Sequence, residues 1–589
     1  MNSQNLYKYA LGSILLMLLA ACQPYDNSHK IAVMETFTLN VEGPMTNEQA
    51  QINPFTDYLL LAHFELNGIS KTVRGFYAAD GKAANTSAES GNIWQVNFTP
   101  EQAGDWQYRL EFKHGKNIAI NPNIVDAELI QLQHESGVIE VIENNQHTIA
   151  SDFLTVKNGY YYQRNNQQFV LKMGANSPET LFAYADFDNT YRAQRPVKNP
   201  EKNDTAYNTQ LHEYLPHIAD WQEGDPTWQR GKGKGLIGAI NYLASTGMNS
   251  IYFITMNITG DGNDVWPYTD HQTFDRFDVS KLAQWDIVFA HMRNKGMIAH
   301  IILQETENEL LLDNGDTQRL RKLYLQELVA RFAHHSNILW NIGEENGPVG
   351  FSPNGQSPEQ VKAMVDYLTA IDPYQHPIII HSHASNKHKH ETLTGLLGHK
   401  NLLGLSFQVD QPARVGKEIA EWRQKSRQAG HMWTISMDEI GIWHTGAKPD
   451  ADDPEHNIMR QQVLWPSLMQ QASGVEWYFG YNYAHNDLNA EDWRSRDNLW
   501  QQTQVARELF EQAGGYSLTS NCAAKNLAYY CLTDGKRALY YFPSFDSALI
   551  EQLPIAAQAK QTWFNPKSGN VVAEPALLTS QNDWLLLVE

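Results

Sequence analysis

Residues Ile338 to Gly347 read I-L-W-N-I-G-E-E-N-G, and residues Trp433 to Gly441 read W-T-I-S-M-D-E-I-G. Each segment is an apolar run that ends in two adjacent carboxylates and a glycine. This pattern is typical of a (β/α)₈ barrel, whose strands deliver polar residues to the C-terminal mouth. Glu345 and Glu439 are 94 positions apart. If they end the fourth and seventh strands, each repeat has about 31 residues, close to the ~30 of a βα unit.

The same α/β texture extends over residues 156–513, where apolar runs alternate with helical periodicity. A chain of 589 residues is too long for one hydrophobic core, so several domains are expected. We predict that residues 156–513 form a (β/α)₈ TIM barrel. Its eight strands are predicted at 169–173, 250–255, 298–303, 338–342, 378–381, 402–407, 433–436 and 475–479.

Two β-rich regions flank the predicted barrel. Residues 33–115 contain short alternating runs broken by Gly, Asn and Pro, which favours an N-terminal β-sandwich. Residues 116–155 are predicted to be a linker. Residues 514–589 return to β texture and are predicted to form a small C-terminal β-sandwich.

The beginning of the chain has the pattern of an export signal. A short polar start is followed by an apolar stretch from Ala10 to Ala21, which is too short to span a bilayer. The ending L-A-A-C at 19–22 resembles a bacterial lipobox. The resemblance implies a lipoprotein signal peptide at 1–22, lipidation of Cys22 and a tether at 23–32. Because Gln23 rather than Asp follows the cysteine, it also implies the outer membrane.

The net charge and the cysteine content indicate what the protein binds and which compartment it occupies. A net charge of −21 argues against nucleic-acid binding, which needs concentrated Lys and Arg. Cys522 and Cys531 lie close together, and an exported chain meets an oxidising compartment, so we predict a disulfide between them. Free structural thiols are the alternative.

Two carboxylates at the C-terminal ends of two strands of one barrel suit glycoside hydrolysis. One protonated carboxyl serves the leaving oxygen, and a second carboxylate attacks the anomeric carbon at about 5–5.5 Å, or activates water at roughly 6.5–9.5 Å. The alternative is that Glu344, Glu345, Asp438 and Glu439 cap helices or pair with basic residues.

The segment W-N-I-G-E-E-N-G resembles the fourth-strand motif of clan-A glycoside hydrolases, in which a W-x-x-G run leads to Asn-Glu. The resemblance implies that Glu345 is the acid/base, and apiosidase-like barrel hydrolases carry an Asp at the same offset. The segment I-S-M-D-E-I-G resembles the seventh-strand motif, which implies that Glu439 is the nucleophile and the mechanism retaining. Glu344 replaces the Asn that normally contacts the sugar. Residues 94–108 resemble the last strands of an immunoglobulin-like module.

Polar and aromatic residues at the other strand ends are predicted to contact sugar hydroxyls and ring faces. These substrate-binding candidates are Asn176, Trp266, Gln304, Glu305, Glu307, Glu344, Asn346, His381, His383, Gln408, Asp438, Trp443, Trp477, Tyr481 and His485.

The run of His381, His383, His388 and His390, together with the lysines among them, would suit an anionic sugar, such as a sulfated or uronic residue. A metal site is disfavoured there, because a His-rich loop does not by itself make ligands converge. No metal or cofactor is therefore predicted.

Two other functions stay open at this point. The first is a non-catalytic carbohydrate-binding surface lipoprotein, and the second is a polysaccharide lyase. A lyase would need a β-eliminating base with uronate-binding Arg or metal, and no Arg cluster occurs at the predicted strand ends. The identity of the sugar, its linkage and exo or endo action are not encoded in these patterns.

Overall fold

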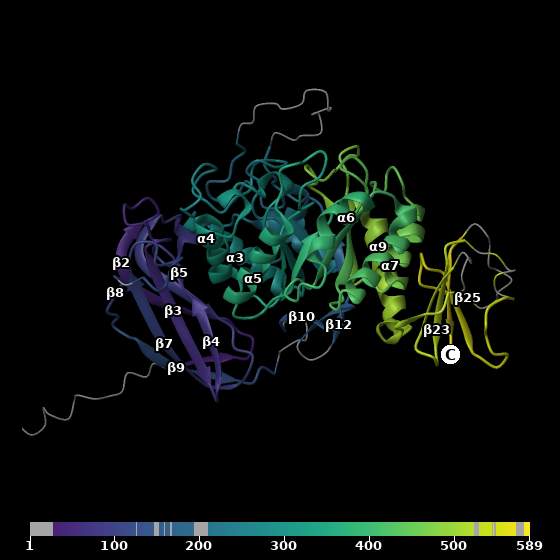
Figure 1. Cartoon of the computed structure of the whole chain (residues 1–589), viewed down its shortest axis with the longest axis horizontal. Coiled ribbons are helices and arrows are strands. Elements are labelled where there is room, and N and C mark those ends of the chain that lie inside the picture. The colour runs from purple at the N-terminus through teal and green to yellow at the C-terminus, as the bar shows by residue number, and fades with distance from the viewer. Residues whose placement is uncertain are drawn as a thin grey trace, which may run out of the picture.

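The computed structural model describes residues 28–124, 126–145, 152–157, 159–164, 168–193, 210–523, 529–544, 546, 549, 551–572 and 582–589. The predicted signal peptide, the lipidated Cys22 and the tether up to residue 27 lie outside the described residues. Figure 1 shows three parts side by side, with an N-terminal sandwich, a central barrel and a C-terminal sheet. Within the described ranges, no helix has both the length and the apolar composition needed to cross a membrane.

The N-terminal part is a sandwich of two sheets. Aromatic rings fill the space between the sheets, as in the stacked pair Phe64 and Phe98, whose centroids are 3.9 Å apart. One sheet contains β1 (Ser28–Ala32), β9 (Ser136–Ile142), β7 (Gly104–His114), β3 (Tyr58–Leu66) and β4 (Ile69–Arg74), with β8 (Glu128–Leu129) paired to β7. The other contains β2 (Phe37–Asn47), β6 (Ser90–Phe98) and β5 (Phe76–Tyr77), and the short helix α1 is Ala83–Thr86.

The predicted boundaries of this sandwich are wrong at both ends. β1 lies in the predicted tether and β9 in the predicted linker, and these two strands pair in parallel, with Ser28 opposite Val138. β9 also pairs with β7 in the middle of the sheet. The sandwich therefore extends from residue 28 to residue 142.

The barrel is closed by eight parallel strands, which confirms the predicted architecture. Every residue of these strands is buried, because one face meets the barrel interior and the other meets helices. The strands are β13 (Lys172–Ala175), β14 (Ser250–Ile254), β15 (Ile298–Ile302), β16 (Ile338–Asn341), β17 (Ile378–His381), β18 (Gly404–Val409), β19 (Thr434–Ile440) and β20 (Gly474–Trp477).

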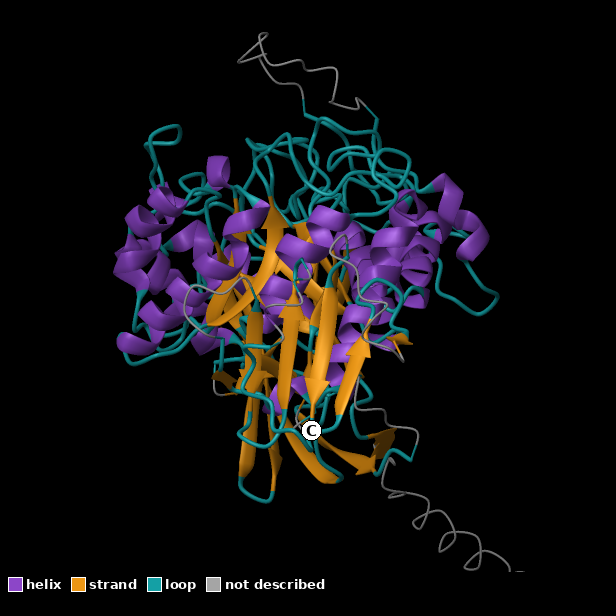
Figure 2. Cartoon of the chain, turned by 90° about the vertical axis from the view of Figure 1, so that its right-hand side faces the viewer, coloured by secondary structure: helices purple, strands orange, loops and turns teal. Residues whose placement is uncertain are grey.

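One helix follows each barrel strand, and Figure 2 shows the helices around the strands. Local sequence signals determine where some of these helices begin. A capping box of Ser357 and Gln360 starts α5, and the Asp278 side chain caps α3. The helices are α2 (Lys234–Ser245), α3 (Val279–Asn294), α4 (Arg319–Phe332), α5 (Pro358–Ile371), α6 (Asn386–Leu393), α7 (Val415–Gln428), α8 (Trp465–Met469) and α9 (Asp497–Gln512).

A small sheet covers the base of the barrel. It consists of β10 (Leu154–Lys157), β11 (Tyr161–Arg164) and β12 (Phe169–Val170). Leu154 and Tyr162 pack on Ile298, Leu339 and Ile379 of three barrel strands. The predicted first strand at 169–173 is therefore two strands, since β12 belongs to the base and only β13 to the barrel.

The C-terminal part has one described sheet with its strands in the order β21 (Ser520–Asn521), β22 (Tyr530–Thr533), β23 (Ala538–Phe542), β26 (Trp584–Val588), β24 (Gln561–Phe564) and β25 (Val571–Val572). One face packs on the barrel, where Tyr541 stacks on Trp465 at 5.3 Å between centroids. The other face forms a separate apolar cluster. A disulfide joins Cys522 and Cys531, with their Cα atoms 5.0 Å apart.

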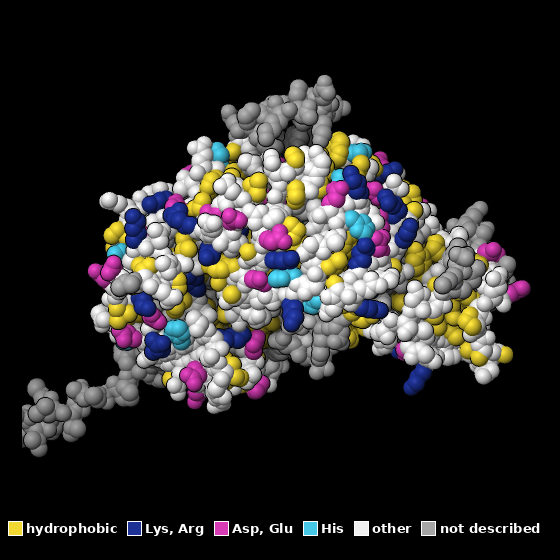
Figure 3. Space-filling model, in the orientation of Figure 1, with side chains coloured by type: hydrophobic (Ala, Val, Ile, Leu, Met, Phe, Trp, Pro, Cys, Tyr) yellow, Lys and Arg dark blue, Asp and Glu magenta, His cyan; other side chains and the backbone are white. Residues whose placement is uncertain are grey.

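The sandwich contacts the barrel beside α3 and α4 (Figure 1). Arg331 of α4 donates to the carbonyl of Tyr77 at 2.8 Å, and the Thr99 hydroxyl donates to the carbonyl of His334 at 2.8 Å. On the face drawn in Figure 3, acidic and basic side chains are intermingled. The strand ends that carry the predicted chemistry belong to the barrel alone.

Candidate active site

Glu439 of β19 is held by residues from the two preceding strands. Gln408 of β18 donates to Glu439 Oε1 at 2.5 Å, and His381 Nε2 of β17 lies 3.1 Å from Oε2. The other ring nitrogen of His381 is 2.9 Å from the Ser406 hydroxyl. The pairing register of β18 and β19 shifts next to Gln408, which brings Gln408 opposite Glu439. Glu439 is thus a buried carboxylate in a fixed orientation.

Glu345 follows β16 and has an unusual backbone, with φ of 39°. Left-handed conformations are uncommon for residues other than glycine and gather at functional sites. Its carboxylate lies 3.6 Å from His383 Nδ1, and its side chain is 25% exposed. It is therefore more accessible than Glu439, whose side chain is 5% exposed.

Glu344 lies between two groups of acidic residues. One of its carboxylate oxygens, a nitrogen of His381 and an oxygen of Glu439 all lie within 4.8 Å of one another. One carboxylate oxygen from each of Glu344, Glu179 and Glu305 also lies within 4.8 Å of the other two. The structure thus brings Glu344 next to Glu439, where the clan-A resemblance implies the Asn that contacts the sugar.

Three further carboxylates at this site were not predicted from the sequence. Glu179 comes shortly after β13, and its backbone N–H donates to Asp487 Oδ1 at 3.2 Å. The Ser177 hydroxyl donates to the same oxygen at 2.5 Å. Tyr481 donates to Asp261 at 2.6 Å. Glu179, Asp261 and Asp487 lie four, seven and ten residues beyond the ends of β13, β14 and β20. They belong to loops, whose course periodicity in the sequence does not reveal.

Burial and like charge raise the pKa of several of these groups. Burial and then Glu439 raise the pKa of Glu344 well above its ordinary value, and burial with Asp487 and Glu344 does the same for Glu179. Burial, opposed by hydrogen bonds from Ser177 and Glu179, raises the pKa of Asp487 to about 7. These carboxyls share protons near neutral pH, because close carboxylates cannot all be ionised.

The pKa values of Glu345 and Glu439 are shifted in opposite directions. Burial raises the pKa of Glu345, but the hydrogen bond and charge of His383 bring it below the ordinary value. Burial and the charges of Glu345 and Asp487 raise the pKa of Glu439 well above the ordinary value. The hydrogen bond that Gln408 donates to Glu439 opposes this rise in its pKa and favours the ionised form.

A buried ionic network lies in the barrel interior beneath these residues. Lys172 of β13 is 2.8 Å from Asp438 and 2.9 Å from Glu476, and all three side chains are fully buried. Its ammonium is also 3.1 Å from His300. Asp438, predicted to contact substrate, therefore pairs with Lys172 inside the barrel, although its neighbour Glu439 lies in the site.

Several residues predicted to contact substrate are buried and instead bond to or pack against other side chains of the protein. Trp477 is fully buried and donates to Thr503 of α9, so it is a core residue and the predicted sugar stacking is wrong. Trp266 is 1% exposed and packs against Tyr191 and His271. Gln304 and Asn346 are buried, and both donate to Gln356.

The remaining candidates lie nearer the surface or keep a free polar atom. Trp443 is 47% exposed, and its ring centroid is 6.1 Å from that of Tyr481. Glu307 and His485 are exposed. The buried Asn176 donates to the carbonyl of Asp438 at 2.8 Å, while its own Oδ1 has no hydrogen-bond partner. Phe351, not predicted, is 66% exposed and has its ring centroid 5.7 Å from that of His383.

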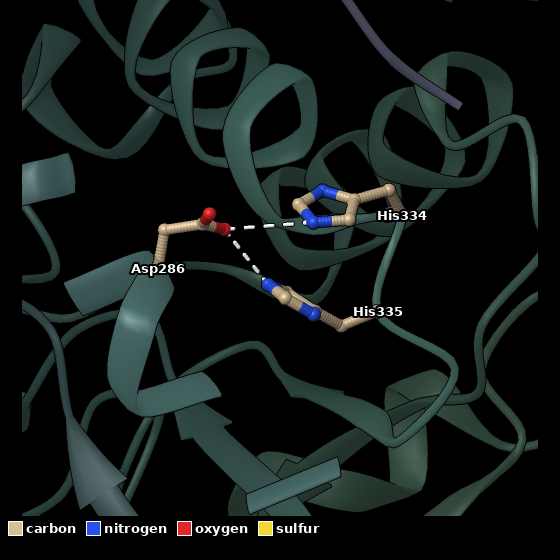
Figure 4. A group of neighbouring side chains, drawn as sticks. All are labelled: Asp286, His334 and His335. Carbon is tan, nitrogen blue, oxygen red and sulfur yellow. Dashed lines mark hydrogen bonds and ion pairs between the residues drawn. The ribbon is translucent and has the colours of Figure 1, made fainter. Parts of the chain in front are cut away.

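A second cluster with metal-ligand chemistry lies away from the barrel mouth. Asp286 of α3 is 2.8 Å from His335 and 3.6 Å from His334, which both follow α4 (Figure 4). Burial lowers the pKa of both imidazoles well below the ordinary value, and the nearby Arg293 acts in the same direction. Because that fixed positive charge opposes a cation, the cluster is better explained as a contact that holds α3 to the end of α4.

Comparison with known proteins bears on the fold. A family model described as a domain of unknown function (DUF5060) matches residues 30–113. No curated protein matches the chain. A candidate glycoside hydrolase from Bacteroides vulgatus is similar over 95% of this chain and 100% of its own, with 14% identity and a TM-score of 0.61. A glycoside hydrolase family 5 protein from the same bacterium is similar over 76% of this chain and 95% of its own, with 14% identity and a TM-score of 0.46. The first similarity shows that the chain has a glycoside hydrolase-like fold.

Proposed function

We propose that the protein is a retaining glycoside hydrolase that acts on a polysaccharide or oligosaccharide. The observation that carries the proposal is the arrangement of Glu439, buried and oriented by Gln408 and His381, beside the carboxyls of Glu344 and Glu345 at the mouth of the barrel. A carboxylate fixed next to a protonated carboxyl is the arrangement that double displacement requires.

In the proposed mechanism, Glu439 attacks the anomeric carbon and forms a glycosyl-enzyme intermediate. Gln408 keeps one carboxylate oxygen in place while the other reacts. A carboxyl of the Glu344–Glu345 pair protonates the leaving oxygen and then, as a base, activates the water that releases the sugar. The motif position favours Glu345 as this donor, whereas the proton distribution favours Glu344.

If Glu344 is the proton donor, the separation of the carboxylates supports retention over inversion. An inverting enzyme separates its carboxyl groups by roughly 6.5–9.5 Å to admit water. Oxygens of Glu344 and Glu439 lie within 4.8 Å of each other. The expected outcome is that the first sugar released has the anomeric configuration of the substrate, as observed by proton NMR during early turnover.

The decisive experiment is hydrolysis of a panel of plant and algal polysaccharides and their oligosaccharides by the wild type and the Glu439→Gln variant. We expect sugar release by the wild type alone, because the amide cannot attack the anomeric carbon. Circular dichroism should be the same for both proteins. Full activity of the variant would contradict the assignment of the nucleophile.

The alternatives predict different products. A carbohydrate-binding lipoprotein would bind glycans equally in the wild type and in the Glu439→Gln variant, without turnover. A lyase would release unsaturated products that absorb in the ultraviolet.

We also propose that the protein is exported and lipid-anchored through Cys22. Metabolic labelling with a fatty acid would test this, and the label should be lost in the Cys22→Ala variant.

A further inference from the structure

We infer that Phe351 stacks on the sugar that leaves when the glycosidic bond is cleaved, so that the site favours sugar chains over glycosides with small leaving groups. The inference rests on the proposed function, because that reaction defines the leaving sugar. It depends on the position of the phenyl ring beside the candidate proton donors, on the way its loop is held and on the exposure of the ring.

Phe351 lies in the loop between β16 and α5, and it is 66% exposed. A single exposed apolar side chain is common on a protein surface, so the inference depends on where this ring lies. The same loop begins with Glu344 and Glu345, the two candidates for the proton donor. The ring is therefore carried by the segment that supplies the donor.

His383 connects Phe351 to Glu345. Its Nδ1 lies 3.6 Å from the Glu345 carboxylate, and its ring centroid lies 5.7 Å from that of Phe351, with the two ring planes at 83°. The ring of His388 lies 5.8 Å from that of Phe351 between centroids, at 66°. Two imidazole rings thus orient the phenyl ring through edge-to-face contacts, a geometry that aromatic pairs prefer.

The contacts place Phe351 on the leaving-group side of the site. Glu439 lies 3.1 Å from His381, the last residue of β17, whereas Glu345 and Phe351 contact His383, two positions beyond the end of that strand. Exposure to solvent increases from Glu439 through Glu345 to Phe351. In double displacement the acid protonates the oxygen of the leaving group, which therefore departs on the side of the donor.

One buried carboxylate holds both ends of the segment that carries the ring. The backbone N–H of Gly347 donates to Glu309 Oε1 at 2.8 Å, and the backbone N–H of Gln356 donates to Glu309 Oε2. His383 Nε2 also donates to the carbonyl of Gly347 at 3.2 Å. The base of the loop is fixed while Phe351 projects from it, so little ordering is needed when a sugar binds to the ring.

The chemistry of the exposed ring matches a sugar ring. The face of a phenyl ring carries partial negative charge, which attracts the C–H groups on the apolar face of a pyranose. Such contacts complement the hydrogen bonds that polar groups of a site make with sugar hydroxyls. A fluoride leaving group has no such face and makes no use of Phe351.

The test compares hydrolysis of two kinds of substrate. The probes are the plant and algal oligosaccharides of the panel and the glycosyl fluoride of the sugar released from them. Phe351→Ala should lower kcat/KM for the oligosaccharide about tenfold, the loss expected for one aromatic contact. The loss should be several-fold smaller with the fluoride, which lacks a leaving sugar. Equal losses with both substrates, or no loss with either, would overturn the inference.

Two further variants test whether the aromatic face is responsible. Phe351→Tyr keeps that face and should retain most of the activity on the oligosaccharide. Val571→Ala removes an exposed apolar side chain from the C-terminal sheet and should behave as the wild type. A Phe351→Tyr variant that is as impaired as Phe351→Ala would contradict the role of the ring.

Binding to the Glu439→Gln variant separates the two proposals. Phe351→Ala in this background should weaken binding of the oligosaccharides, measured by isothermal titration calorimetry, about tenfold. Binding that depends on Phe351, without hydrolysis by the wild type, would reject the catalytic proposal and keep the sugar contact. Hydrolysis that does not depend on Phe351 would keep the catalytic proposal and reject the inference. Failure to bind any oligosaccharide of the panel would reject both.

Discussion

Glu344 and Glu345 are neighbours in sequence but have opposite surroundings. Glu344 lies among carboxylates that raise its pKa, and Glu345 lies beside His383, which lowers it. A general acid must hold a proton at the working pH. The two residues therefore differ in a property that kinetics can separate.

We predict that loss of the proton donor slows hydrolysis of natural linkages by about 10²–10⁴-fold. An aryl glycoside with an acidic leaving group should be much less affected, because that group departs without protonation. Glu344→Gln and Glu345→Gln should be compared on both substrates, with azide added to rescue the donor-deficient variant. If neither variant shows this leaving-group dependence, the donor lies outside this pair.

Asp487 should make stability dependent on pH. Its pKa is about 7 in the folded protein, above the ordinary 3.8 of an aspartate, chiefly because it is buried. The folded state therefore binds more protons than the unfolded state between about pH 4 and 7, and its stability falls as pH rises through that window.

The variant Asp487→Asn has no proton to lose, so it should gain stability relative to the wild type as pH rises from about 4 to 7. The full shift corresponds to a relative gain on the order of 4 kcal/mol. Urea unfolding at several pH values would measure the difference. A difference that does not change with pH would show that Asp487 titrates at its ordinary value in the folded protein.

At the scale of elements, β13 shows how one strand supports the site without contacting it. Its first residue, Lys172, links β13 to Asp438 of β19, Glu476 of β20 and His300 of β15. Asp438 precedes Glu439, so the position of the proposed nucleophile depends on this ionic network. Branched apolar residues usually fill such a barrel interior.

We predict that Lys172→Met lowers the free energy of unfolding by about 3–5 kcal/mol, because it leaves two buried carboxylates without their cation. Adding Glu476→Gln should recover part of the loss, since the two residues interact directly. Burial and, in smaller part, the charge of Lys172 lower the pKa of His381, so that pKa, followed by NMR, should rise in the single variant. An unchanged pKa would mean that Lys172 acts through packing alone.

At the scale of the molecule, the C-terminal sheet is joined to the barrel on one face and has its own apolar cluster on the other. The disulfide between Cys522 and Cys531 is sited at this second cluster, distant from the barrel mouth in the chain. Its effect should therefore be confined to the C-terminal sheet.

Replacing both cysteines with serine should destabilise that sheet by about 2–3 kcal/mol, the chain-entropy cost of a loop of about ten residues. Differential scanning calorimetry should show that the sheet unfolds at a lower temperature than in the wild type. Below that temperature, turnover at the barrel mouth should be unchanged. A matched loss of turnover would show that the sheet and the site are coupled.

The sequence by itself determined the barrel, because buried parallel strands are continuous apolar runs and a βα repeat has a nearly fixed length. It also placed Glu344, Glu345, His381, Gln408 and Glu439 at the mouth, since parallel strands end at the same edge. Short alternating runs likewise predicted the N-terminal sandwich.

Only the tertiary structure decided which side chains meet. The parallel pair β1 and β9 joins segments about a hundred residues apart, and no local pattern encodes such a pairing. Trp477 faces α9 because a strand alternates its side chains, and the end of an apolar run does not reveal which face is inside. Glu179 and Asp487 belong to loops, whose course follows from packing and hydrogen bonding rather than from periodicity. The βα repeat in the sequence therefore determined the barrel, and long-range contacts determined which side chains meet at its mouth.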